Sequence, residues 1–126
     1  MEHMYDLVIL GCGPAGLSAA VNAVIRNKKV LVMGTEICSP PLHKAQLINN
    51  YLGMPNIKGE DLLSSFMRHA ENMGVEISTQ KADTISEIDG IYHILSGDEV
   101  ITSKTIIIAT GVPYKPTLPK EDYFLG

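Results

Sequence analysis

The sequence has little positive charge and no long apolar run. Its ten lysine and arginine residues are outnumbered by fourteen acidic residues, which gives a net charge of −4. A basic surface for nucleic acid is therefore not expected. No stretch is long enough to span a bilayer, and the opening MEHMYD lacks the basic start and cleavage site of a signal peptide. These absences predict a cytoplasmic protein without nucleic-acid or membrane partners.

Cysteine is also scarce. Cys12 and Cys38 are the only two, and they form no CxxC, so the spacing of a disulfide framework or a zinc site is missing. Cys12 lies within a glycine-rich turn, where we expect it to pack rather than to react, while the role of Cys38 stays open. No metal site is predicted. Four histidines are scattered along the chain and are expected at the surface or its boundary: His3, His43, His69 and His93.

The opening third of the chain has the pattern of a βαβ unit. Apolar residues make up 45% of the 126 residues and charged residues 19%, as in an ordinary small globular domain. Residues 6–10 are an apolar run that ends in glycine, typical of a buried parallel strand. Pro14 suits the first turn of a helix that runs to Arg26, and Asn27 can end it in a left-handed conformation. Residues 29–33 predict a second buried strand, reached by a right-handed crossover.

The remaining chain predicts one more helix and several strands. Residues 34–59 hold three prolines without clear periodicity, so we expect an irregular and functional segment. Apolar residues three and four apart predict a core helix over 59–73, followed by a strand over 75–79. Hairpin turns at Asp89-Gly90 and Gly97-Asp98 then predict three short antiparallel strands. Residues 105–109 predict a further buried parallel strand, and residues 112–126 a proline-rich loop.

Three glycines at the first strand-to-helix junction indicate a nucleotide site. Gly11, Gly13 and Gly16 form GxGxxG. The first glycine allows the tight turn, the second lets a pyrophosphate approach the backbone, and the third lets helix and strand pack closely. The helix N-terminus adds free N–H groups and a positive dipole end. Because the strand before and the helix after both fit, the motif predicts dinucleotide binding.

The order of the later elements favours FAD over a nicotinamide dinucleotide. An acidic group at the end of the second strand usually holds the adenosine ribose. Gly34 occupies that place, and Glu36 is either the ribose ligand or a solvated loop carboxylate. No lysine or arginine stands there for a 2′-phosphate, so NADP is disfavoured at this site. An irregular segment, a meander and a strand ending in Ala109-Thr110-Gly111 replace the further βα repeat of a plain NAD domain.

Four motifs in order resemble the N-terminal part of bacterial low-molecular-weight thioredoxin reductases. YDLVILGCGPAGLSAA resembles the opening flavin motif of that family, and Met33-Gly34-Thr35-Glu36 resembles its second-strand end. INNYLG, residues 48–53, is similar to the segment whose asparagine reaches the flavin, here Asn50. TIIIATG, residues 105–111, is similar to the closing strand of the first half of the flavin domain. The resemblance covers essentially the whole chain.

The resemblance implies an α/β, Rossmann-like three-layer FAD-binding fold with a central parallel sheet and an inserted three-stranded antiparallel meander, incomplete as a domain. Residues 1–115 would be the first segment of that domain, and residues 116–126 a connector toward a central redox domain. The cofactor would be FAD, and no residue of this chain is assigned a catalytic role. The residues expected to bind the cofactor are Gly11, Gly13, Pro14, Ala15, Gly16, Gly34, Thr35, Glu36, Asn50, Ala82, Ala109, Thr110 and Gly111.

Two departures from the family pattern refine the expected function. Cys38-Ser39-Pro40-Pro41-Leu42 stands where the family usually has Gly-Gly-Gln, which is most similar to the clostridial ferredoxin-dependent type. The chain also stops before the redox CxxC, so it resembles a fragment that is inactive alone. The resemblance implies electron flow from ferredoxin or NADPH through FAD to a dithiol and thioredoxin, in a homodimer. The alternatives are the flavin half of a hydroperoxide-reductase subunit or of a ferredoxin–NADP reductase, or a non-catalytic nucleotide-binding module.

Overall fold

Six strands form one mixed sheet in the order β3-β2-β1-β6-β5-β4. The computed structural model describes residues 4–111; the expected loop and connector beyond residue 111 lie outside the described residues. The strands are β1 (Met4–Leu10), β2 (Val30–Met33), β3 (Glu76–Ser78), β4 (Thr84–Ile88), β5 (Ile91–Ser96) and β6 (Glu99–Ile108), and the helices are α1 (Pro14–Ile25), α2 (Pro40–Lys44) and α3 (Gly59–Asn72).

β1 is the central strand and is covered on both faces. It pairs in parallel with β2 on one side and with β6 on the other, with Val8 opposite Leu31 and Ile106. Val8 and Ile9 are both completely buried. A continuous apolar run is what a parallel strand buried on both faces needs, so the prediction for this strand is confirmed.

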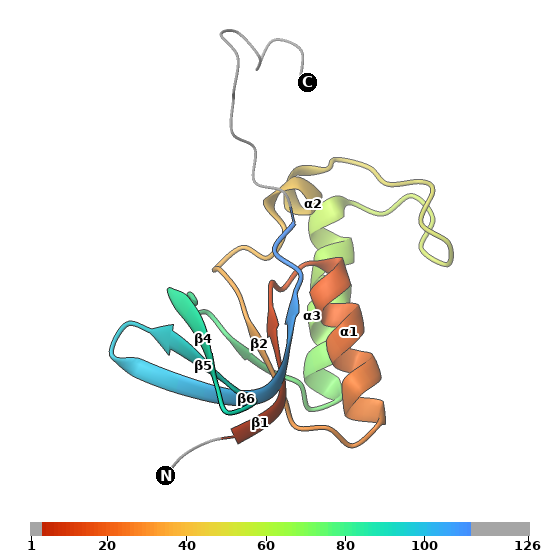
Figure 1. Cartoon of the computed structure of the whole chain (residues 1–126). Helices are drawn as coiled ribbons and strands as arrows, with labels where there is room; N and C mark the ends of the chain where they lie inside the picture. The colour runs from red at the N-terminus through yellow and green to blue at the C-terminus, as the bar shows by residue number, and fades with distance from the viewer. Residues whose placement is uncertain (1–3, 112–126) are drawn as a thin grey trace, which may run out of the picture.

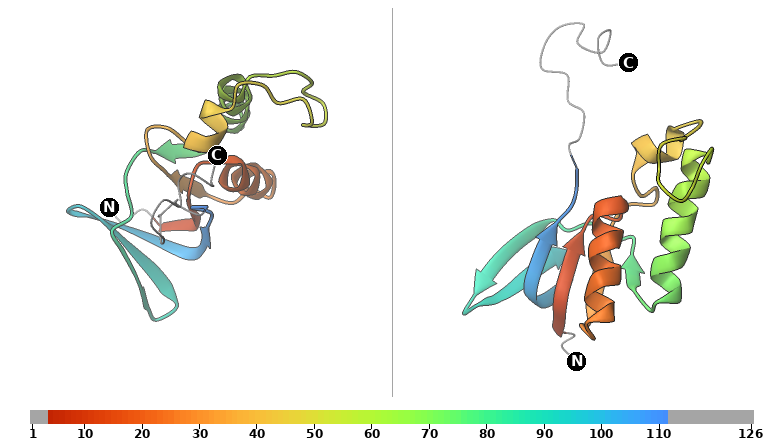
Figure 2. Two further views of the ribbon diagram at one scale, coloured as in Figure 1. Left: turned by 90° about the horizontal axis from the view of Figure 1, so that it is seen from above. Right: turned by 90° about the vertical axis from the view of Figure 1, so that its right-hand side faces the viewer.

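The two faces of β1 belong to two separate cores, which makes the molecule three-layered. Ile9 packs with Leu17 of α1 and Leu63 of α3, and Figures 1 and 2 show both helices on that face of the sheet. Val8 packs instead with Ile94 and Ile101 of the meander, which curls over the opposite face. Because side chains alternate along a strand, neighbouring residues of β1 serve different layers.

β6 differs from the prediction because it joins two expected strands into one. Its first half pairs antiparallel with β5, with Ile101 opposite Ile94, and its second half continues in parallel beside β1, with Thr105 opposite Leu7. No glycine or proline interrupts residues 99–108, so the strand stays continuous although it bends strongly between the two halves (Figure 1). The strand is also less buried than predicted: Ile107 is 40% and Ile108 70% exposed. α1 and α3 cover β1 to β3 rather than β6 (Figure 1).

The two long helices end at the predicted residues, and a short one is new. Asn27 follows α1 with φ of 60°, and Gly74 follows α3 with φ of 86°, both in the left-handed region that ends helices. α2 is a five-residue helix within the segment expected to be irregular. No helix within residues 4–111 is long and apolar enough to cross a membrane.

Candidate cofactor site

Three chain segments converge at the carboxyl edge of the parallel strands. Gly11 follows β1, Gly34 follows β2 and Ala109 follows β6. The backbone N–H of Gly11 donates to the Met33 carbonyl oxygen at 2.8 Å, and that of Ala109 donates to the Leu10 carbonyl oxygen at 2.7 Å. These bonds extend the ladder past the last strand residues and fix the three turns side by side. Ligands of open α/β sheets bind outside this edge.

Two glycines of the turn are required by close backbone approach. Gly11 has φ of 120°, and a Cβ there would collide with the carbonyl oxygen of Ala109. A Cβ on Gly16 would collide with the carbonyl oxygen of Gly11. The first glycine therefore brings β1 against the end of β6, and the third brings α1 against the turn, as the motif predicts.

Gly13 has a different role because its backbone is ordinary. It is the N-cap of α1 in an extended conformation with φ of −79°, and no side chain caps the helix. Among residues 4–111, and apart from its chain neighbours, only Ser39 would come within 4 Å of an added Cβ, at 3.4 Å. Pro14 occupies the first turn and no acidic residue lies in it, so the N–H groups of Ala15 and Gly16 have no intrahelical acceptor and are available to an anion. This uncapped turn fits a pyrophosphate.

The turn after β2 carries the expected ribose-binding residues. The N–H of Gly34 donates to the Ser78 carbonyl oxygen at 2.9 Å, which holds the turn at the sheet edge. Thr35 and Glu36 are exposed just beyond it, and the hydroxyl of Thr35 donates to the Ile37 carbonyl oxygen at 2.9 Å. Glu36 is thus free to reach a ligand, or solvent, beside the glycine turn.

Two of the expected residues lie elsewhere. Asn50 is exposed on the segment between α2 and α3, which extends beyond the ends of these helices and away from β1 and β6 in both Figures 1 and 2. Ala82 is partly buried against the meander core, between β3 and β4. The glycine turn, the Gly34 turn and residues 109–111 are brought together, whereas Asn50 is not.

The structure corrects the expectation for the cysteines. Cys12 and Cys38 form a disulfide, with Cα atoms 5.1 Å apart, so Cys12 is bonded rather than merely packed. Both are buried, at 4% and 6% exposure. The bond links the glycine turn to the segment after β2, 26 residues away. A sequence pattern without CxxC gives no sign of it, because only the pairing of β1 with β2 places the two strand ends together.

Gly34 explains how the disulfide fits. A Cβ at this position would collide with Sγ of Cys12 and would lie 2.8 Å from its Cβ. Real Cβ atoms essentially never approach so closely, so an acidic side chain at the end of β2 is incompatible with this position of Cys12. Two sequence features together could have indicated that Cys12 lies against the end of β2. They are the cysteine within the glycine turn and Gly34 in place of the usual acidic residue.

The clearly shifted pKa values belong to groups at the opposite end of β1. Burial, together with a hydrogen bond to Glu76, raises the pKa of Tyr5 to about 12; its hydroxyl donates to Oε2 of Glu76 at 2.9 Å. The backbone N–H of Lys29 donates to Asp6 at 2.8 Å and, with Lys104 at 3.5 Å, lowers the pKa of that carboxyl group. No cluster of three metal-ligating side chains occurs within the described residues.

The fold and the glycine turn define a nucleotide-binding oxidoreductase domain, and sequence comparison gives the family. Residues 5–125 match the family described as "Pyridine nucleotide-disulphide oxidoreductase", and the chain belongs to it. It is 33% identical to thioredoxin reductase of Treponema pallidum over its whole length. It is 34% identical to the 34.2 kDa protein in the rubredoxin operon of Clostridium pasteurianum over 99% of its length. The chain spans 42% and 41% of these two relatives.

Solved structures agree with this assignment. A ferredoxin-flavin thioredoxin reductase from Clostridium acetobutylicum superposes with a TM-score of 0.86 and 40% identity, over 96% of this chain and 42% of that one. Thioredoxin reductase from Streptococcus pyogenes gives a TM-score of 0.85 and 30% identity, over 98% of this chain and 41% of that one. The expected resemblance and fold class are confirmed: the chain has the Rossmann-like fold of the FAD-binding domain in thioredoxin reductases. Its family implies a flavin cofactor.

Proposed function

We propose that this chain is the FAD-binding portion of a flavin-dependent thioredoxin reductase. The observation that carries the proposal is the uncapped glycine turn at the carboxyl edge of β1, in a fold that matches thioredoxin reductases. When bound, FAD supplies two-electron transfer to a disulfide. The chain's own residues bind and orient the cofactor. In the whole protein the electrons would pass to a dithiol and then to thioredoxin.

The proposed binding residues contact three parts of FAD: the pyrophosphate, the adenosine ribose and the flavin half. The N–H groups of Ala15 and Gly16 would hold the pyrophosphate at the positive end of α1. Glu36 would accept a hydrogen bond from the adenosine ribose. The turn at residues 109–111 would lie along the flavin half, where its small residues leave room. Asn50 would contact the flavin once the segment between α2 and α3 lies over the sheet edge. Ala82 is the last of the residues that we propose to bind the cofactor.

Ferredoxin is the proposed electron donor, ahead of NADPH. The support is the 40% identity to a reductase whose name specifies ferredoxin and flavin. The segment Cys38-Ser39-Pro40-Pro41-Leu42 in place of Gly-Gly-Gln supports the same choice. The remaining parts of the proposal are a flavin-domain segment over residues 1–115, a connector over 116–126, the redox CxxC beyond this chain, a cytoplasmic location and a homodimer.

Gly13 offers a test that separates binding from folding. An aspartate at an N-cap position stabilises a helix, and the extended backbone of Gly13 accepts a side chain without strain. Gly13→Asp should therefore keep the fold while its carboxylate repels the pyrophosphate, weakening FAD binding by roughly a hundredfold or more. Flavin fluorescence titration measures the affinity, and thermal unfolding checks the fold.

Gly13→Asn is the matched control, because asparagine has nearly the same shape and caps equally well without the charge. We expect it to bind FAD more weakly than the wild type but clearly more tightly than Gly13→Asp. Equal FAD affinity in the wild type and both variants would place the cofactor elsewhere and reject the site.

A further inference from the structure

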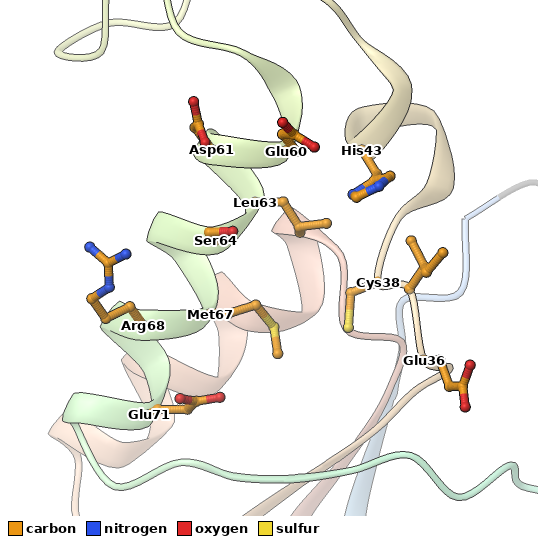
Figure 3. Close-up of a pocket in the computed structure, with 11 residues that line it drawn as sticks. Glu36, Cys38, His43, Glu60, Asp61, Leu63, Ser64, Met67, Arg68 and Glu71 are labelled. Carbon is orange, nitrogen blue, oxygen red and sulfur yellow. The ribbon is translucent and has the colours of Figure 1, made fainter.

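The two sulfurs of the Cys12–Cys38 disulfide have different surroundings. Cys38 lines an open hollow of about 480 Å³ between the segment after β2 and α3, and Cys12 is not among its lining residues. Figure 3 shows Cys38 on one wall, with Leu63 and Met67 of α3 on the other. Of the residues expected to bind the cofactor, only Glu36 lines this hollow, so it is a place apart from the glycine turn. Both cysteines are nearly buried, but of the two only Cys38 borders the hollow, so a reagent in the hollow is adjacent to Cys38.

The surroundings suit the dithiol as well as the disulfide. Each sulfur lies 3.9 Å from the carbonyl oxygen of Thr35. In the disulfide neither sulfur carries a proton, so these are contacts only. After reduction, each S–H could donate to this oxygen without a change in the backbone. The reduced pair would then have a polar partner already in place.

The position of Cys12 makes it the better leaving group. It precedes Gly13, the N-cap of α1, a helix of 12 residues without a side-chain cap, whereas Cys38 precedes the N-cap of α2, which has only 5 residues and so fewer aligned peptide dipoles. The positive end of a helix dipole lowers the pKa of a nearby thiol, and a thiolate of lower pKa leaves faster in disulfide exchange. Two features therefore favour attack on Cys38 with departure of Cys12. Cys38 borders the hollow, and the positive end of the α1 dipole stabilises the thiolate of Cys12.

The charges of the hollow select the attacking thiol. Four carboxylates line it, against the guanidinium of Arg68 and the imidazole of His43; the acidic residues are Glu36, Glu60, Asp61 and Glu71. A surface of this sign attracts cations and repels anions over distances comparable to the Debye length. A thiol that carries a positive charge would enter more readily than one that carries a negative charge.

We propose that Cys12–Cys38 is a reversible thiol–disulfide exchange site that takes a cationic thiol or dithiol at Cys38. The incoming thiolate bonds to Sγ of Cys38 as the bond between Cys38 and Cys12 breaks, and Cys12 leaves as a thiolate that takes a proton from water. With a dithiol, its second thiolate attacks the mixed disulfide and releases Cys38. Two electrons and two protons pass from the dithiol to the cysteine pair, and the dithiol becomes a disulfide.

Three small thiols of similar size test both the attacked sulfur and the charge selection. As thiols, cysteamine is cationic, 2-mercaptoethanol neutral and 2-mercaptoethanesulfonate anionic; the attacking thiolates carry one more negative charge each, so the acidic hollow should repel them in that order of increasing strength. Each is added to the native protein without denaturant, the free thiols are alkylated, and mass spectrometry locates the adducts. We expect the adduct on Cys38 and the alkyl group on Cys12. Rates compared at equal thiolate concentration should differ by roughly tenfold between cysteamine and the sulfonate, and salt should reduce the difference.

Two glutamate variants sharpen the test. Glu71→Gln removes a carboxylate from the hollow and should reduce the rate ratio, whereas Glu87→Gln on exposed β4 lies outside the hollow and should leave it unchanged. Adducts on Cys12, opening of the bond only in denaturant, or two free thiols after mild oxidation would overturn the exchange site. Rates that do not depend on thiol charge would overturn the cationic substrate.

The inference goes beyond the proposed FAD function and can fail separately from it. None of the measurements requires a cofactor, so each can be made on the wild-type protein whether or not it binds FAD. Absence of thiol exchange in a protein that binds FAD would reject the Cys12–Cys38 exchange site and leave the proposed FAD function standing. Normal exchange in a protein that binds no FAD would reject the proposed function alone.

Discussion

At the scale of single residues, contacts that exclude a Cβ determine what the carboxyl edge can hold. Gly11, Gly16 and Gly34 each bring one segment against another, whereas Gly13 leaves its surface open. The family sequence motif predicts the roles of the three turn glycines, because each role follows from backbone geometry. It does not predict that of Gly34, whose neighbour Cys12 approaches only after β1 and β2 pair.

Tyr5 gives a residue-scale prediction for alkaline pH. Its pKa is raised to about 12 in the folded protein, from about 10 in the unfolded chain, so the folded state holds this proton more tightly. The stabilisation is fully present below pH 10 and is lost as the pH rises to about 12. Tyr5→Phe removes the hydrogen bond to Glu76 and should lower the free energy of unfolding at pH 7 by about 1 kcal/mol.

Urea unfolding at pH 7, 10 and 11.5 checks this. The wild type should lose its advantage over Tyr5→Phe between pH 10 and 11.5, because only the wild type has the Tyr5 phenol whose proton is held more tightly in the folded state. Tyr92→Phe on β5 is the control for the removal of a phenol group elsewhere in the sheet. A gap between wild type and Tyr5→Phe that widens with pH would contradict the assignment.

At the scale of elements, prediction from sequence succeeded where local signals were strong. The βαβ unit followed from two buried apolar runs, Pro14 and Asn27, which together specify the strands and both helix ends. The prediction wrongly divided β6 into two strands. The change from an antiparallel partner, β5, to a parallel partner, β1, leaves no mark in the sequence of this ten-residue strand. α2 was missed because five residues are too few to show a helical period.

The disulfide gives an element-scale prediction because it ties the glycine turn to the start of α2. It closes a loop with a sequence separation of 26, which should stabilise the folded state by about 3 kcal/mol through the entropy of the unfolded chain. Cys38→Ser should therefore unfold at a lower urea concentration than the oxidised wild type. Reduced wild type is the matched control and should unfold with the variant. Coincident unfolding of the oxidised and reduced proteins would show that the bond adds no stability.

At the scale of the whole molecule, the proposed nucleotide turns lie at one edge of a sheet that the described helices cover only in part (Figure 1). The chain spans about two fifths of the relatives it matches, and Ile107 and Ile108 at the end of β6 are both exposed. The proposed pyrophosphate and adenosine contacts lie within residues 11–36. The account therefore requires that FAD be recognised mainly through this half of the site.

The most direct measurement is the visible absorption spectrum of the purified protein, with chromatography of any nucleotide that heat releases. The account predicts a flavin spectrum, as purified or after incubation with FAD, and release of FAD close to one per chain. A colourless protein that takes up no added FAD but binds NAD would contradict it.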